Sequence, residues 1–366
     1  MTGKHFLAVR KRALIEFFFL VHLGIILQLL IQSSLGTASI LIDQRPSHEE
    51  KIQVSKPDVV WLMSYPNSGT SYTLGNVEAM TKTSVGTNYG VADELKDAIQ
   101  RYQGGPWVKQ NLALPPTGSG LLTKTHCGHG NLQKPLSKLL NDTTTMTLRF
   151  EPDCQRGNMK RVGLIRYGDQ HDNPQNQSPN VTRAIHLVRN PFANVVARMN
   201  HFAKMKQARQ RQQKFRNTAV ATSPQGYDTR QDFVWWCRNQ DERWILPEGK
   251  NEDDVTKMYQ SQFANLPCRS EWHKYITWHN QVLKVSQQES LATMRLYYES
   301  YETDFTKTND EILAFLKLVP VYDPMPFSPG RNYYDFYTAE ERTLAKQFVM
   351  RHATTECWDI IHHYFE

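Results

Sequence analysis

DVVWLMSYPNSGTSY, residues 58–72, is the stretch of sequence that determines the predicted fold. Its first seven residues form an apolar run of strand length, flanked by Pro57 and Pro66, and such a run predicts a buried β-strand. The small polar residues that follow lead into a plausible helix through Met80. A strand, a small-residue loop and a helix N-terminus make an anion site, because free backbone N–H groups converge there and the helix dipole adds positive potential.

The loop provides groups that an anion needs, although it is not a Walker A loop. Gly69 lets the backbone approach a phosphate closely, and hydroxyl donors stand at Ser68, Thr70 and Ser71. A Walker A loop ends in Gly-Lys-Ser/Thr, and no lysine occurs between Lys56 and Lys82. An ordinary ATPase or GTPase is therefore disfavoured. Taken alone, a strand-to-helix turn with N-capping serines explains this segment equally well.

The loop resembles the 5′-phosphosulfate loop of sulfotransferases that use 3′-phosphoadenosine 5′-phosphosulfate (PAPS), which usually reads Pro-Lys-Ser-Gly-Thr-Thr-Trp in the cytosolic branch. Asn67 stands where that branch has a lysine, and Tyr72 replaces a tryptophan that stacks on adenine, a role a tyrosine can also fill. The resemblance implies that PAPS is bound by Pro66, Asn67, Ser68, Gly69, Thr70, Ser71 and Tyr72.

RAIHLVRNP, residues 183–191, resembles the 3′-phosphate motif of the same family. An apolar strand runs into Arg189, whose guanidinium fork suits a phosphate monoester. The family has a serine eight residues later, where this chain has Ala197. The resemblance therefore implies a 3′-phosphate contact from Arg189, with the hydroxyl contact either missing or supplied by a neighbour such as Arg198 or Asn200.

LLTKTH, residues 121–126, resembles the Lys-Thr-His that supplies the catalytic histidine in the cytosolic branch. The resemblance implies that His126 takes a proton from the acceptor hydroxyl, as an imidazole titrating near neutral pH can do. Lys124 is then expected to stabilise negative charge that develops during transfer. A histidine after a strand is more often structural, but its place between the two cofactor motifs favours catalysis.

MRLYYES, residues 294–300, resembles a later family strand that ends in Tyr-Glu-Asp beside the adenine, which implicates Tyr298. A helix is expected over residues 311–318. The family's C-terminal Arg-Lys-Gly loop is not found, and Arg331 is the candidate for its 3′-phosphate contact. Together these matches imply an α/β fold of the P-loop nucleotide-binding type, with a mostly parallel central sheet flanked by helices on both faces. The catalytic domain is expected at 57–366, with an insertion at about 127–182.

The N-terminus predicts a membrane anchor. Basic residues precede an apolar run from Ala13 to Ile31, which is long enough to cross a bilayer. The positive-inside rule then gives a cytosolic tail at 1–12, a transmembrane signal-anchor helix at 13–32 and a lumenal stem at 33–56. We expect a type II Golgi membrane protein; a cleaved signal peptide is the main alternative, and a core helix is a third. Sequons at Asn141 and Asn180 agree with a lumenal domain.

Charge and cysteine content suggest the partners. The net charge of +7 favours an anionic ligand, and seven basic residues between Arg198 and Arg216 predict either a polyanion-binding helix or merely a solvated one. An acidic glycan is the expected hydroxyl acceptor; nucleic acid is not expected, because of the membrane segment.

The five cysteines form no CxxC pair, so no metal is expected. One or two disulfides are expected, and a Cys237–Cys268 pair is plausible. Tryptophans cluster in the later half, and many are expected in the core.

Two other functions stay open. One is a different P-loop phosphotransferase, which the missing Walker lysine disfavours. The other is a lumenal glycan-binding protein on a degenerate sulfotransferase fold, which the departures at Asn67 and Ala197 keep possible.

Overall fold

The structure, a computed structural model of the 366-residue chain, describes residues 57–88, 99–102, 106–128, 150, 154, 181–214, 229–245, 261–329 and 333–366. The predicted tail, transmembrane helix and stem at 1–12, 13–32 and 33–56 lie outside these residues, as do the asparagines of both sequons and most of the predicted insertion. Within the described part of the chain, no helix is both long and apolar enough to span a membrane.

A seven-stranded sheet forms the centre of the described structure, in the order β3-β4-β2-β5-β1-β6-β7. β1, β2, β5, β6 and β7 run parallel to their neighbours among themselves, whereas β4 pairs antiparallel with both β2 and β3. The strands are β1 Asp58–Ser64, β2 Gly86–Thr87, β3 Ile99–Arg101, β4 Trp107–Lys109, β5 Gly120–Thr125, β6 Val181–Val188 and β7 Ala292–Tyr297. The predicted mostly parallel sheet is therefore confirmed.

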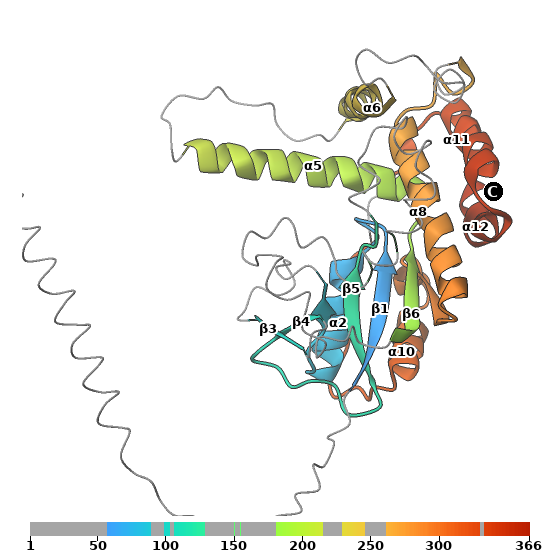
Figure 1. The fold of residues 1–366 in the computed structure, drawn as a ribbon. Helices are drawn as coiled ribbons and strands as arrows, with labels where there is room; N and C mark the ends of the chain where they lie inside the picture. The colour runs from blue at the N-terminus through green and yellow to red at the C-terminus, as the bar shows by residue number, and fades with distance from the viewer. Residues whose placement is uncertain are drawn as a thin grey trace, which may run out of the picture. The chain divides into compact units, whose positions relative to one another are not determined.

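Helices cover both faces of this sheet, as predicted (Figure 1). The central strand β1 has an unbroken apolar run because successive side chains enter opposite cores: Val59, Trp61 and Met63 belong to one core, and Val60 and Leu62 to the other. On the first face lie α5 Pro191–Lys214, α6 Arg230–Ile245, α8 Arg269–Gln288, α11 Ala339–His352 and α12 Thr355–Ile361. On the second lie α2 Thr70–Thr81, α9 Ser300–Thr303 and α10 Phe305–Leu316.

Short 3₁₀ helices complete the C-terminal region, η3 at Tyr334–Phe336 and η4 at His362–Phe365. A helix is present where one was expected at 311–318, but the expected bounds were wrong. α10 begins six residues earlier, at Phe305, and it ends at Leu316 because Lys317 adopts a left-handed conformation with φ of 56°.

Two disulfides are present, and one is the pair considered plausible from the sequence, Cys237–Cys268. It joins α6 to the residue just before α8. The other joins Cys127, directly after β5, to Cys154. Cys357 is a buried free thiol. The tryptophans that cluster in the later half include four core residues and one largely exposed residue, which are, respectively, Trp236, Trp244, Trp272 and Trp278, and Trp235.

Candidate active site

Four adjacent parallel strands end at one edge of the sheet, and the predicted site residues follow them directly. The loop of residues 66–72 follows β1, His126 follows β5, Arg189 follows β6 and Tyr298 follows β7. Segments more than a hundred residues apart in the chain are therefore brought to the same edge. The carboxyl edge of a parallel sheet is where α/β proteins bind their ligands.

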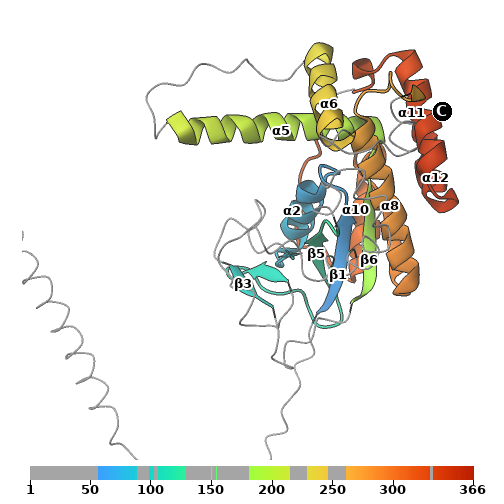
Figure 2. The same ribbon diagram turned by 45° about the horizontal axis from the view of Figure 1, so that its top comes forward.

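The connections after β1 and β6 leave the sheet on opposite faces. β1 leads into α2 on the face of the second core, whereas β6 leads through α5, α6 and α8 on the face of the first core before the chain enters β7. Figures 1 and 2 show α2 and α8 on opposite sides of β1 and β6. A crevice forms at such a topological switch point. The loop after β1 and Arg189 after β6 flank this point.

The loop turns sharply before α2. Asn67 and Gly69 have positive φ angles of 67° and 97°, and Gly69 is the N-cap of α2 without a side-chain capping bond. The serine-capped turn considered from the sequence is therefore absent. A Cβ atom at Gly69 would lie 2.1 Å from the Tyr298 ring, so this position requires glycine both for its backbone conformation and for the close approach of Tyr298.

Asn194, in the first turn of α5, holds the loop in place through two hydrogen bonds. Its Nδ2 atom donates to the backbone oxygen of Pro66 at 3.1 Å and to Ser68 Oγ at 3.0 Å. Ser68 is fully buried. Because Ser68 Oγ accepts from Asn194, its own proton is available for an anion at the loop. α5 begins where it does because Asn190 Oδ1 caps the N–H groups of Phe192 and Ala193 and Pro191 starts the helix.

Arg189 connects β6 to the loop. Its Nη1 atom donates to the backbone oxygen of Asn67 at 2.6 Å, and its guanidinium carbon lies 4.9 Å from the centre of the Tyr298 ring. Tyr275 donates to the backbone oxygen of Arg189 at 2.6 Å and so fixes the end of the strand. Within the described part of the chain, Arg189 Nε is buried without a hydrogen-bond partner. A buried, unsatisfied cationic donor suits an anionic ligand.

A cavity of about 270 Å³ lies beside this arginine. Its lining includes Arg189, Asn190, Tyr298, Glu299, Phe327 and Tyr334. Small-molecule pockets have volumes of about 300–1,000 Å³, so this cavity lies just below the lower end of that range. Hydrogen bonds from Asn190 connect the residues of the cavity wall: its N–H donates to Glu299 Oε1 at 2.9 Å, and its Nδ2 donates to Tyr334 Oη at 2.7 Å.

Tyr72 lies next to this cavity rather than in its lining. Its ring packs edge-on against Tyr301 and Phe327, and its hydroxyl donates to the backbone oxygen of Met325 at 2.8 Å. Burial raises the pKa of Tyr72 to about 12. Phe327, which the sequence did not single out, provides an aromatic face in the cavity. It reaches this place because the segment before it is bonded along α2, for example from Met325 N to Asn76 Oδ1 at 2.8 Å.

His126 contacts Ser64, the last residue of β1. Its Nδ1 atom lies 2.8 Å from the backbone oxygen of Ser64 and 3.3 Å from Ser64 Oγ. A backbone oxygen only accepts, so the neutral ring carries its proton on Nδ1 and its lone pair on Nε2. A lone pair on Nε2 is what a general base requires.

Lys124 lies in β5, two residues before His126, beside Leu62 of β1 and Thr87 of β2, and its side chain is half-buried. Both residues predicted to carry the chemistry are thus at the carboxyl edge. Arg331, the candidate for a second 3′-phosphate contact, lies outside the described residues. The described residues contain no group of three or more His, Cys, Asp and Glu side chains that could hold a metal ion.

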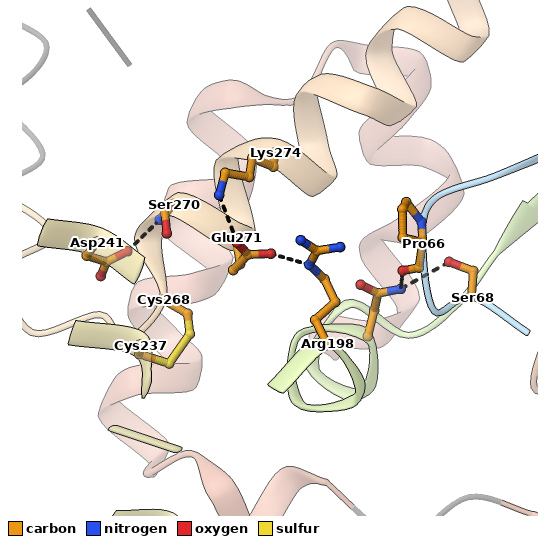
Figure 3. A network of polar contacts seen from close by, with 10 residues as sticks. Pro66, Ser68, Arg198, Cys237, Asp241, Cys268, Ser270, Glu271 and Lys274 are labelled. Carbon is orange, nitrogen blue, oxygen red and sulfur yellow. Dashed lines mark hydrogen bonds and ion pairs between the residues drawn. A yellow bond between two sulfur atoms is a disulfide. The ribbon is translucent and has the colours of Figure 1, made fainter. Parts of the chain in front are cut away.

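Arg198 does not replace the serine that is missing at Ala197. Figure 3 shows Arg198 bound to Glu271 of α8, which is also bound by Lys274 at 2.8 Å. The Arg198 guanidinium lies 5.2 Å from the centre of the buried Tyr65 ring. Burial disfavours the Glu271 carboxylate, but Arg198 and Lys274 outweigh this and lower its pKa to about 2. Arg198 therefore packs against Tyr65, just before the loop, and belongs neither to a phosphate site nor to an exposed basic face.

Sequence reasoning missed Ser64, Asn190, Asn194 and Glu299. Asn190 carried a usable signal, because Asn-Pro before a helical segment is typical of an N-cap followed by the first helical residue. The contacts of Ser64 and Asn194 depend on which strands become neighbours, and no local pattern reveals that order.

Comparisons with protein-family models, with curated proteins and with solved structures gave no match.

Proposed function

We propose that this chain is a PAPS-dependent sulfotransferase, which transfers the sulfuryl group of PAPS to an acceptor hydroxyl and releases adenosine 3′,5′-bisphosphate. The observation that carries the proposal is the pairing of Arg189 with the loop: its Nη1 bonds Asn67 while its Nε is buried without a partner beside a cavity, within the described residues. PAPS bears anionic groups at both its 5′ and 3′ positions. A loop at a helix N-terminus and an arginine one strand away can receive both groups.

Each part of the nucleotide has residues suited to it. The backbone N–H groups at the start of α2 and the hydroxyls of Ser68, Thr70 and Ser71 would hold the 5′-phosphosulfate. Arg189, and in addition Arg331, would bind the 3′-phosphate. Tyr298 and Phe327 supply aromatic surface to the cavity for the nucleoside.

The proton of the acceptor hydroxyl goes to His126. As the acceptor oxygen forms its bond to sulfur, Nε2 of His126 takes the proton, and the bond between sulfur and the phosphate oxygen of PAPS breaks. Lys124 stabilises the negative charge at this edge, which matters because Asn67 replaces the lysine of the cytosolic branch. No metal is required for these roles.

The acceptor and the compartment form the remaining part of the proposal. A lumenal catalytic domain in the Golgi fits the basic flank before the apolar run, and an acidic glycan as acceptor fits the basic residues of α5. Lys204 is exposed on α5, and Figures 1 and 2 show the C-terminal half of this helix running away from the sheet edge that carries the site.

A transfer assay tests this function. The purified full-length chain is incubated with PAPS labelled in its sulfate or with ATP labelled in its γ-phosphate, together with acidic polysaccharides, neutral glycans, tyrosyl peptides and glycolipids. We expect label to move from PAPS to a glycan hydroxyl. Transfer from ATP instead would support a phosphotransferase. Glycan binding with no binding of PAPS would support a degenerate glycan-binding protein.

A further inference from the structure

A buried hydroxyl group connects the loop to His126. Ser64, the last residue of β1, is fully buried. Its Oγ atom lies 2.7 Å from Thr70 Oγ1 and 3.3 Å from His126 Nδ1, while its backbone oxygen lies 2.8 Å from the same Nδ1. One residue therefore contacts both the first residue of α2 and the histidine after β5.

The chemistry of this cluster limits the directions of its protons. The backbone oxygen of Ser64 only accepts, so Nδ1 of the neutral His126 ring must donate. Ser64 Oγ then cannot donate to Nδ1, whereas it can donate its proton to Thr70 Oγ1 at 2.7 Å, a contact in which either hydroxyl can be the donor. With Ser64 as the donor, Thr70 Oγ1 accepts this proton, and within the described residues it has no other hydrogen-bond partner. Its proton is left for an acceptor at the loop, where the N–H groups of α2 also converge.

We propose that Ser64 is a positioning residue that couples anion binding at the loop to the orientation of His126; this inference rests on the proposed function. An anion at the loop accepts the Thr70 proton and completes a chain of donors from Ser64 Oγ through Thr70 to the anion, and His126 joins this chain through the longer, 3.3 Å branch of a bond that Nδ1 shares between Ser64 O and Ser64 Oγ. Hydrogen bonds in such a chain strengthen one another. The bound nucleotide thereby holds the imidazole ring in one orientation, with the proton on Nδ1 and the lone pair on Nε2. The 5′-phosphosulfate thus helps to prepare the base that its own transfer requires.

The ring nitrogens of His126 report on this coupling. The full-length chain is labelled with ¹⁵N in its histidine side chains, and the His126 signals are identified by their loss in His126→Gln. In the unmodified chain we expect a neutral ring with the proton on Nδ1, and a change in the Nδ1 shift when adenosine 3′,5′-bisphosphate is added. In Ser64→Ala, which keeps the backbone oxygen but lacks the hydroxyl, we expect nucleotide binding without this change. Ser64→Thr restores the hydroxyl and should restore the response.

Kinetics and controls separate coupling from a purely structural role. Ser64→Ala should lower kcat by about fivefold or more, the loss expected for one hydrogen bond, with little change in the KM for PAPS. Ser270→Ala removes another fully buried serine hydroxyl and should change neither kcat nor the His126 response. If Ser64→Ala does not fold, Thr70→Val interrupts the same chain from the loop side and must also abolish the response.

The possible failures are distinguishable. If the unmodified chain binds no adenosine 3′,5′-bisphosphate in calorimetry, the proposed function fails, and this inference fails with it. If the chain binds the nucleotide but His126 does not respond, only the coupling is overturned. An undiminished His126 response in folded Ser64→Ala or Thr70→Val would overturn it equally.

Discussion

Arg189 donates a hydrogen bond of 2.6 Å from Nη1 to the backbone oxygen of Asn67, a residue 122 positions earlier in the chain. This bond ties the end of β6 to the loop after β1. Because Asn67 has a positive φ, its peptide group is turned so that its oxygen reaches the guanidinium. The loop and the arginine are therefore held together before any ligand binds, which lowers the ordering cost of binding.

Replacement of this arginine should weaken nucleotide binding selectively. Arg189→Ala removes a charge-assisted phosphate contact, worth about 1.5–3 kcal/mol, so the Kd for adenosine 3′,5′-bisphosphate should rise by at least about tenfold in calorimetry. Arg183→Ala is the matched control, since Arg183 lies at the other end of β6, where it bonds Phe315 O and Asp58. Similar losses of affinity in the two variants would contradict a specific role for Arg189.

Removal of the His126 imidazole should abolish turnover and spare binding. The proposed nucleotide contacts come from the loop and Arg189, so His126→Ala should keep its affinity for adenosine 3′,5′-bisphosphate. Turnover should fall by about 10²–10⁴-fold, the contribution of a positioned general base. Rate, affinity and Tm are measured on one preparation. A folded variant with near-normal turnover would exclude His126 as the base.

The buried carboxylate of Glu271 should be essential for stability. Glu271→Gln leaves Arg198 and Lys274 without their shared counter-charge, and loss of one partner of a buried pair costs about 3–5 kcal/mol. Glu311→Gln is the control, because its pair with Lys307 is exposed at 3.9 Å and such pairs contribute about 0–1 kcal/mol. The free energies of unfolding in urea give the comparison, and equal losses would contradict the network shown in Figure 3.

Stability should decline when the pH falls below about 6.5. Burial lowers the pKa of His186 and of His273 to about 3, and it lowers that of His279 well below its usual value. Between pH 6.5 and 3 the unfolded chain binds protons at these histidines and the folded chain does not, so the free energy of unfolding decreases with falling pH. Each group contributes up to about 1.4 kcal/mol per pH unit.

Urea unfolding between pH 7.5 and 5 checks this dependence. His273→Phe should reduce the slope below pH 6.5, because one of the three imidazoles with a lowered pKa is removed. Stability that is constant or increases as the pH falls from 6.5 to 5 would show that these histidines are protonated in the folded chain.

The strands that carry the candidate site could be predicted from the sequence because each is marked by a local apolar run. The apolar runs that form β1 and β6 are continuous, and each leads directly into its polar residues. Since parallel strands share a carboxyl edge, strands placed from such runs also place the loop, His126 and Arg189. The prediction that helices cover both faces came from the family resemblance, and the continuous burial of β1 agrees with it, because a strand without an exposed face needs two cores.

The contacts between these segments could not be read from the chain. Arg198 seemed available for a phosphate because Glu271, its buried partner, is 73 positions away on another helix. Phe327 enters the cavity because the chain after α10 is bonded along α2, and no periodic pattern marks that irregular segment. The proposed role of Ser64 depends on its contact with His126, which follows from β5 lying beside β1. These three misses concern tertiary partners, whereas the wrong bounds of α10 and the missed N-cap at Asn190 concern local elements.

The most direct test of a PAPS site is discrimination between two nucleotides by the full-length chain. Calorimetric Kd values are measured for adenosine 3′,5′-bisphosphate and for adenosine 5′-monophosphate, together with the increase in Tm that each produces through linkage. The two differ only in the 3′-phosphate, so the bisphosphate should bind at least about tenfold more tightly, as one charge-assisted phosphate contact requires. Arg189→Ala should remove most of that preference. Equal affinities for the two nucleotides in the unmodified chain would contradict a 3′-phosphate site and, with it, the assignment of this chain as a PAPS-dependent sulfotransferase.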